Sequence, residues 1–263
     1  LLDLASLDVA REPLRALYLR NNRLRTLELH QELPALRELD ASYNELNAQQ
    51  RPLRLPALAT LRLTANHKLG TKGLEKLQLY SMRALTELDA SATSLESLAA
   101  LRGVTALTHL TLDSNRLGAA TATALSSIGS LHALVEVSLC GNSLSDAVLP
   151  YLAGSAATLS ALRLDDNSVA SLAPLPPLPR LVELSLARNR LTSLAPLAVP
   201  HDDAAAETYP MLELLDVRDN ALPLDDELAV RSPIAALTAL AEVSLAGNPG
   251  ADSAAVASAL ARL

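Results

Sequence analysis

Leucine recurs at fixed spacing along the chain, and a polar residue follows at the same place in each recurrence. In the stretch LRALYLRNNRL, leucines stand at offsets 0, 3, 5 and 10 from Leu14, and Asn22 stands at offset 8. The same spacing begins again at nine later positions, which are Leu36, Leu58, Leu85, Leu107, Leu134, Leu159, Leu181, Leu212 and Leu240. Ten copies whose starts are 22 to 31 residues apart predict a chain built from repeated supersecondary units.

Each copy is expected to contain one short β-strand. The leucines at offsets 3 and 5 are two residues apart, so their side chains lie on the same face of a strand. Residues at offsets 2, 4 and 6 then lie on the opposite face. The leucines at offsets 0 and 10 precede the strand and follow its turn, and both can enter the same core.

The asparagine at offset 8 is explained by the turn that must follow each strand. A sharp turn leaves backbone N–H and C=O groups pointing inward, and an amide side chain supplies both a donor and an acceptor for them. The sequence therefore predicts a ladder of buried asparagines at Asn22, Asn44, Asn66, Asn115, Asn142, Asn167, Asn189, Asn220 and Asn248. Thr93 takes this position in the fourth copy, where its hydroxyl can fill only part of the role.

The spacing resembles the pattern L-x-x-L-x-L-x-x-N-x-L of the leucine-rich repeat family over nearly the whole chain. Departures are few: Ala41 and Ala90 replace the leucine at offset 5, and Lys68 and Gly250 replace the one at offset 10. The 22-residue copies resemble those of intracellular members, and the longer copies resemble those of ribonuclease-inhibitor-like members. The resemblance implies an α/β solenoid, a curved horseshoe with a concave parallel β-sheet and an outer face that mixes helical, 3-10 and extended segments.

We expect a single domain of about ten repeats over residues 1–263. Residues 1–13 are expected to be a truncated N-terminal repeat, and residues 249–263 a C-terminal capping helix. Among the spacers, residues 71–85, 118–134 and 145–159 are long enough for helices, with Ser145 or Asp146 as an N-cap. Residues 25–35 are too few for a full helix and are expected to form extended or 3-10 segments.

Composition and charge narrow the classes of partner. Aromatic residues make up only 2% of the chain, the net charge is −7 and the sequence pI is about 5.3. This acidity argues against nucleic acid and against an anionic membrane surface, both of which attract basic patches. No apolar run is long enough for a membrane span. Cys140 is the only cysteine, which favours a reducing compartment and predicts a cytoplasmic protein.

The concave face is the candidate functional surface. Offsets 2, 4 and 6 of the ten copies hold ten acidic residues and four arginines, with Arg62 and Arg163 as isolated cationic points. We expect this face to bind a protein with a basic surface, against the alternative of an ordinary solvent-exposed face. The candidate contact residues are Tyr18, Arg20, Glu38, Asp40, Tyr43, Arg62, Glu87, Asp89, His109, Asp113, Glu136, Arg163, Asp165, Glu183, Asp216 and Arg218.

Catalytic and metal-binding motifs are absent from the sequence. It contains no G-x-x-x-x-G-K-[ST], G-x-S-x-G or H-E-x-x-H pattern, and no motif pairs Cys140 with a base. The insertion at residues 195–211 contains His201, Asp202 and Asp203, but adjacent residues rarely converge on one ion. We therefore predict no catalytic residues, no cofactor and no bound metal.

The resemblance and the acidic face together predict a non-catalytic protein–protein interaction scaffold, as a component of a cytoskeletal or ciliary assembly. One alternative is a regulatory subunit of a protein phosphatase, although the concave face has few of the aromatic residues which that class carries. Another is the recognition module of a longer multidomain enzyme.

Overall fold

The computed structural model describes residues 14–29, 33–119, 125–198, 209–224 and 233–251. These residues form two compact units, residues 1–134 and residues 135–263, and each is described by itself. The predicted truncated repeat at 1–13 lies outside the described residues, as does most of the predicted capping helix. Of that helix only residues 249–251 are described, and they form a turn.

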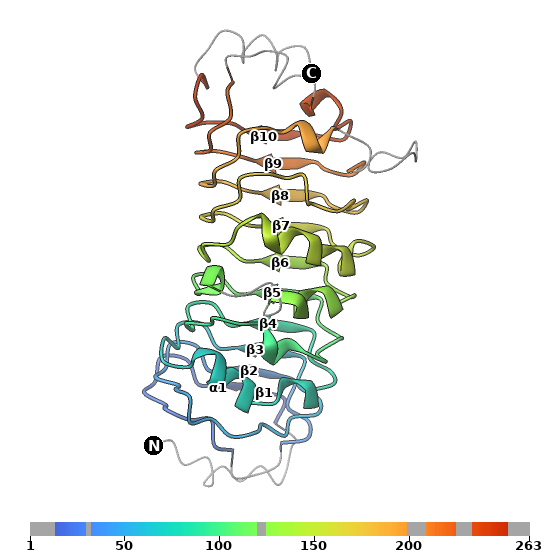
Figure 1. Ribbon diagram of the computed structural model, residues 1–263. Coiled ribbons are helices and arrows are strands. Elements are labelled where there is room, and N and C mark those ends of the chain that lie inside the picture. Colours follow the sequence, from blue (N-terminus) through green and yellow to red (C-terminus); the bar gives the residue numbers. More distant parts are fainter. Residues whose placement is uncertain (1–13, 30–32, 120–124, 199–208, 225–232, 252–263) are drawn as a thin grey trace. The chain divides into compact units, whose positions relative to one another are not determined.

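Each unit contains five short strands that run parallel in the order of the sequence (Figure 1). In the first unit they are β1 (Ala16–Tyr18), β2 (Glu38–Asp40), β3 (Thr60–Arg62), β4 (Glu87–Asp89) and β5 (His109–Thr111). In the second unit they are β6 (Glu136–Ser138), β7 (Ala161–Arg163), β8 (Glu183–Ser185), β9 (Leu214–Asp216) and β10 (Glu242–Ser244). One strand per copy was predicted from the repeat, and all ten strands fall at offsets 2 to 4.

Neighbouring strands pair without a shift in register. Glu38 is opposite Ala16 and Thr60, so offset 2 of one copy meets offset 2 of the next, and the other pairs of neighbouring strands within each unit follow the same register. The ladder continues past the strand, because the N–H of Leu19 donates to the Asp40 carbonyl at 2.6 Å. Side chains at the same offset in successive copies of a unit therefore lie next to one another in a row.

The turn after each strand is made by a left-handed residue at offset 7. All ten copies place a positive φ there, between 52° and 74°. The residues are Asn21, Tyr43, Ala65, Ala92, Ser114, Gly141, Asp166, Arg188, Asp219 and Gly247. Eight of them carry a side chain, and left-handed backbone costs such residues about 1–2 kcal/mol. The hydrogen bonds that follow the turn must offset this cost.

Those hydrogen bonds come from the asparagines at offset 8. Asn66 is fully buried, and its Nδ2 donates to the carbonyls of Ala41 at 3.0 Å and Leu63 at 2.7 Å. Its Oδ1 accepts from the N–H of Leu46 in the preceding copy at 3.0 Å. Asn66 therefore joins two copies, and among the described residues no buried side-chain N or O atom lacks a partner. Asn22, which was also predicted to be buried, is exposed, and its side chain bonds only within its own copy.

Thr93 makes only one of these contacts. Its hydroxyl donates to the carbonyl of Ala90 in its own copy at 2.6 Å. It accepts nothing from the N–H of Lys68, the residue that corresponds to Leu46 in the preceding copy. Thr93 therefore lacks the hydrogen bond by which an asparagine accepts from a backbone N–H of the preceding copy.

The outer segments mix helical types, as the resemblance implied. The α-helix α1 (Gly70–Lys76) lies wholly within the described residues. The 3-10 helices are η2 (Leu79–Ser81), η3 (Ala99–Leu101), η4 (Leu117–Ala119), η5 (Ser126–Ser130), η6 (Asp146–Ser155) and η7 (Ala195–Leu197). Ser145 is the N-cap of η6 and accepts from the N–H of Ala147 at 3.5 Å.

Leucine layers form the core between the strands and the outer segments. In the second to ninth copies the residues at offsets 0, 3, 5 and 10 are buried, with Lys68 as the exception. Leu125, Ile128 and Leu131, which belong to the spacer at residues 118–134, are all buried. The parallel strands, leucine layers and outer segments therefore have the predicted α/β solenoid architecture.

Candidate functional site

The strand face consists of the residues at offsets 2, 4 and 6, and it is the surface on which the predicted contact residues lie. It is divided equally between the units: each holds five carboxylates and two arginines. Because the strands pair in register, side chains from adjacent copies stand next to one another and can interact.

Four strands of the first unit are joined by a chain of polar contacts. The Tyr18 hydroxyl donates to Glu38 at 2.8 Å. Arg62 lies between two carboxylates, with one guanidinium nitrogen bonded to Glu38 and another donating to Glu87 at 2.9 Å. Thr60 donates its hydroxyl hydrogen to Glu87 at 3.1 Å.

These contacts hold Glu38 as a carboxylate. The hydrogen bonds from Tyr18 and from Arg62 lower the pKa of Glu38. The hydrogen bond between Tyr18 and Glu38 also raises the pKa of the Tyr18 phenol. The side chains of Glu38, Arg62 and Glu87 are each about a third exposed to solvent, so the cluster remains accessible to a partner.

The second unit repeats this arrangement. Arg163 donates to both carboxylate oxygens of Glu183, at 2.6 and 2.7 Å, and lies 3.7 Å from Glu136 on its other side. The bond to Glu183 raises the pKa of Arg163. In both units an arginine at offset 4 is flanked by glutamates at offset 2 of the copies before and after it. Arg62 and Arg163 are therefore not the isolated points that the sequence analysis described, and each triad retains one net negative charge.

The aspartates at offset 4 also stabilise the turns that follow their strands. One carboxylate oxygen of Asp40 accepts from the N–H of Ser42 at 2.9 Å, and Asp89 does the same for Ser91 at 2.9 Å. Asp216 accepts from the N–H of Arg218 at 3.1 Å and also bonds its guanidinium. An aspartate two residues before an N–H is a common turn-stabilising arrangement. The spacing was visible in the sequence, but the sequence analysis assigned these residues to binding alone.

Aromatic residues gather at the β1 end of the first unit. The Arg20 guanidinium lies over the Tyr43 ring at 4.7 Å from its centroid, which is a cation–π contact. Tyr18 is 63% exposed and Tyr43 46% exposed. Exposed tyrosine and arginine are the residue types that most often dominate protein interfaces.

The remaining candidates are dispersed. His109 is exposed, and its ring nitrogen Nδ1 lies 2.9 Å from the Thr108 hydroxyl. The N–H of Asp113 donates to the Ser91 hydroxyl at 3.2 Å. Asp165 accepts from the Ser185 hydroxyl at 2.6 Å and lies 3.6 Å from the half-buried sulfur of Cys140.

Among the described residues, no group of three His, Cys, Asp or Glu side chains is placed to bind a metal ion. His201, Asp202 and Asp203 of the predicted insertion lie outside the described residues. Within the same residues, no helix combines the length and the apolarity that crossing a membrane requires.

Comparison with known proteins identifies the fold. No family model matches the chain, and no similar curated protein was found. Among solved structures, internalin F of Listeria monocytogenes matches with 20% identity and a TM-score of 0.56, covering 82% of this chain, which spans only 63% of that internalin. Internalin C2 of the same organism matches with 23% identity and a TM-score of 0.54, over 88% of this chain and 80% of its own.

A third match comes from an octameric complex of latrophilin 3, Unc5D and FLRT2, in which the leucine-rich repeat part belongs to FLRT2. It has 20% identity and a TM-score of 0.62, and covers 89% of this chain and 76% of the matched one. These similarities establish the leucine-rich repeat fold for this chain.

Proposed function

We propose that this chain is a non-catalytic scaffold whose strand face binds a protein with a basic surface. The observation that carries the proposal is the pair of glutamate–arginine–glutamate triads, each exposed on rigid strands and each with one negative charge in excess. Three of the aspartates that hold their turns add further negative charge to the same face. A partner with lysine or arginine would find these carboxylates already oriented.

The structural relatives support protein binding as the class of function. FLRT2 was solved in a complex with latrophilin 3 and Unc5D, and the plant peptide hormone receptor RGFR1, with a TM-score of 0.50, was solved with RGF2. We extend only the class of function from those proteins to this chain. The identity of the partner must come from this chain's own surface.

A cytoplasmic location, in a cytoskeletal or ciliary assembly, is part of the proposal. Its support is the composition: the one cysteine, Cys140, is a free thiol, so no intrachain disulfide stabilises the repeats. Proteins in oxidising compartments commonly use disulfides for that purpose. Fluorescent tagging of the full-length protein in its own cells tests the location, and a secreted product would contradict it.

The binding proposal is tested by neutralising the strand face. We expect Glu38→Gln/Glu87→Gln to release partners that wild-type protein retains on an affinity column. The matched control is Glu75→Gln/Glu96→Gln, which removes the same charge from exposed residues away from the strand face. We also expect the association rate of the purified partner to fall as salt rises, because steering between charged surfaces is screened by ions.

Two results would count against the strand face. One is equal retention of partners by the Glu38→Gln/Glu87→Gln variant and by wild type. The other is equal loss in both variants, which would show a response to net charge alone. Circular dichroism spectra of the variants should match wild type, since both glutamates are about a third exposed and their ion pairs contribute about 1 kcal/mol or less.

A further inference from the structure

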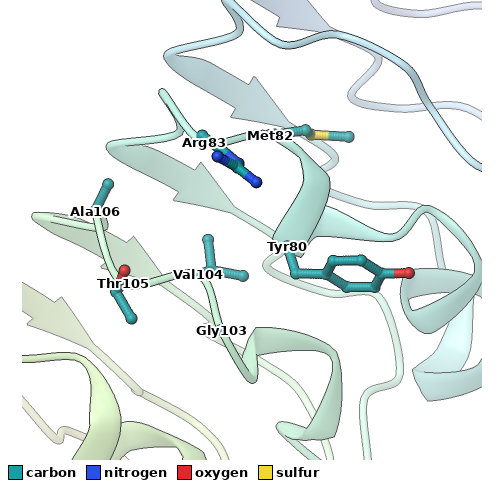
Figure 2. A pocket seen from close by; sticks show the side chains of 7 residues that line it. All are labelled: Tyr80, Met82, Arg83, Gly103, Val104, Thr105 and Ala106. Atoms are coloured by element: carbon teal, nitrogen blue, oxygen red, sulfur yellow. The ribbon is translucent and has the colours of Figure 1, made fainter.

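A second surface of the first unit has a different chemistry from the strand face. The loops that lead into β4 and β5 enclose an open pocket of about 470 Å³. It is lined by Tyr80, Met82, Arg83, Gly103, Val104, Thr105 and Ala106 (Figure 2). Met82 and Val104 are buried and supply an apolar floor, whereas the Tyr80 side chain is 56% exposed at the wall.

Basic residues border this pocket on three adjacent copies. Arg54 follows Leu53, whose carbonyl accepts from the Ser81 hydroxyl at 3.4 Å, so the Arg54 segment runs beside η2. Arg102 precedes Gly103, where an added Cβ would lie 3.5 Å from the Cβ of Tyr80. Together with Arg83 these residues form the basic rim, defined as Arg54, Arg83 and Arg102, and all three are exposed.

The charge around the basic rim is positive over a wider area. Away from the strand face, residues 51–116 carry eight exposed lysines and arginines against two glutamates. The second unit differs, because residues 135–263 contain sixteen acidic and seven basic residues. The first unit therefore has a basic outer surface, although the net charge of the whole chain is negative.

The pocket also offers donors that the described fold leaves unused. Arg83 forms no ion pair with any residue that the structure describes. Figure 2 shows its guanidinium extending into the space beside Val104 and Tyr80. The backbone N–H groups of Thr105 and Ala106 likewise donate no hydrogen bond within that part of the chain. An arginine with nearby free N–H groups is suited to a carboxylate.

We propose that this pocket and the basic rim bind an extended, acidic segment of a protein. A carboxylate of the segment pairs with Arg83, and a neighbouring apolar side chain lies on Met82 and Val104 against the Tyr80 ring. Further acidic residues of the segment face Arg54 and Arg102. The chain would thereby present two surfaces of opposite charge, and this second surface does not depend on the strand face.

A protein segment fits better than a nucleic acid. The pocket accommodates one or two side chains on an apolar floor, and it presents one aromatic ring rather than the row of rings on which successive bases stack. The acidic strand face on the same unit repels a long polyanion. A short acidic peptide can reach the basic rim without extending to that face.

The test uses fluorescence polarisation with a short fluorescein-labelled peptide in which pairs of glutamates alternate with leucines. We expect Arg83→Glu/Arg102→Glu to weaken binding by about tenfold or more. The matched control, Lys72→Glu/Arg116→Glu, makes the same charge change at exposed residues that do not line the pocket, and should retain the wild-type affinity within about threefold.

A second pair of variants tests the aromatic wall at constant charge. Tyr80→Ser should weaken peptide binding, while Tyr43→Ser, at a comparably exposed tyrosine of the strand side, should not. The proposal is overturned if the labelled peptide does not bind, if both charge-reversal variants lose affinity equally, or if single-stranded DNA displaces the peptide as well as unlabelled peptide does. The Glu38→Gln/Glu87→Gln variant should bind the peptide with wild-type affinity, because the strand face is a separate surface. If the peptide-binding proposal fails, the proposal for the strand face is therefore unaffected.

Discussion

The asparagine ladder gives the sharpest prediction for stability, at Asn66. Asn66→Ala removes the acceptor for the N–H of Leu46 and the donor for the carbonyl of Leu63, and both backbone groups are left without another described partner. The carbonyl of Ala41 keeps its bond from Asn44 at 3.0 Å. Each buried group left unpaired costs about 1–3 kcal/mol, so we expect a loss of about 3 kcal/mol in the free energy of unfolding.

The matched control is Asn22→Ala in the first copy. Asn22 is exposed and bonds only within its own copy, to the carbonyls of Leu19 and Arg20. The Leu19 carbonyl retains a bond from Asn44 at 2.9 Å, so we expect a loss below about 1 kcal/mol.

Guanidinium unfolding followed by circular dichroism measures both losses. Because a repeat array can unfold in parts, hydrogen exchange of the Leu46 amide should be measured as well. We expect that amide to exchange faster in Asn66→Ala and unchanged in Asn22→Ala. Similar losses for the two variants, with no change at Leu46, would refute the role assigned to the ladder.

Three further predictions concern single positions. Thr93→Asn should supply the missing acceptor for the preceding copy and raise the free energy of unfolding by about 1 kcal/mol, measured in guanidinium. Gly247→Ala should lower it by about 1–2 kcal/mol, because φ is +74° there and the added Cβ would lie 2.0 Å from an oxygen of Asp219; Asp219→Ala should restore part of the loss. Burial raises the pKa of the Tyr209 phenol, so its stabilising contribution is complete below the unfolded pKa of about 10 and is lost as pH rises above it. In Tyr209→Phe, thermal unfolding scans should show a smaller fall in Tm between neutral and strongly alkaline pH than in wild type.

The repeat pattern predicted the strands and the leucine layers, because their periodicity follows directly from which side chains must be buried. The left-handed turn at offset 7 gave no such signal. That position holds Asn, Tyr, Ala, Ser, Asp, Arg or Gly, so no residue type marks it and only the geometry of the closed turn requires it. Backbone hydrogen bonds between copies, rather than local preference, impose the conformation.

The outer segments show a similar limit. The spacer at residues 145–159 was expected to hold a helix, and the helix there, η6, is of the 3-10 type over ten residues. A 3-10 helix rises about 2.0 Å per residue against about 1.5 Å for an α-helix, so it spans a fixed width with fewer residues. The sequence indicates a helix in that spacer but does not distinguish the 3-10 type from the α-helix.

At the candidate site, composition predicted the sign of the charge but not its organisation. The triads around Arg62 and Arg163 join residues 20 to 27 positions apart, and they become visible only when the register of neighbouring copies is known. The aspartates that hold their own turns were assigned to binding because exposure and structural role cannot be separated from residue type alone. The pocket beside Arg83 had no sequence signal, since its lining comes from two spacers with no common motif.

Carbodiimide crosslinking of the native complex, followed by mass spectrometry, tests the account most directly. The reagent joins carboxylates to lysine amines, and this chain has carboxylates but no lysine on its strand face. We predict amide crosslinks from Glu38, Glu87, Glu136 or Glu183 to lysines of the partner. Crosslinks found only on the outer loops or at the two ends of the chain would contradict binding by the strand face.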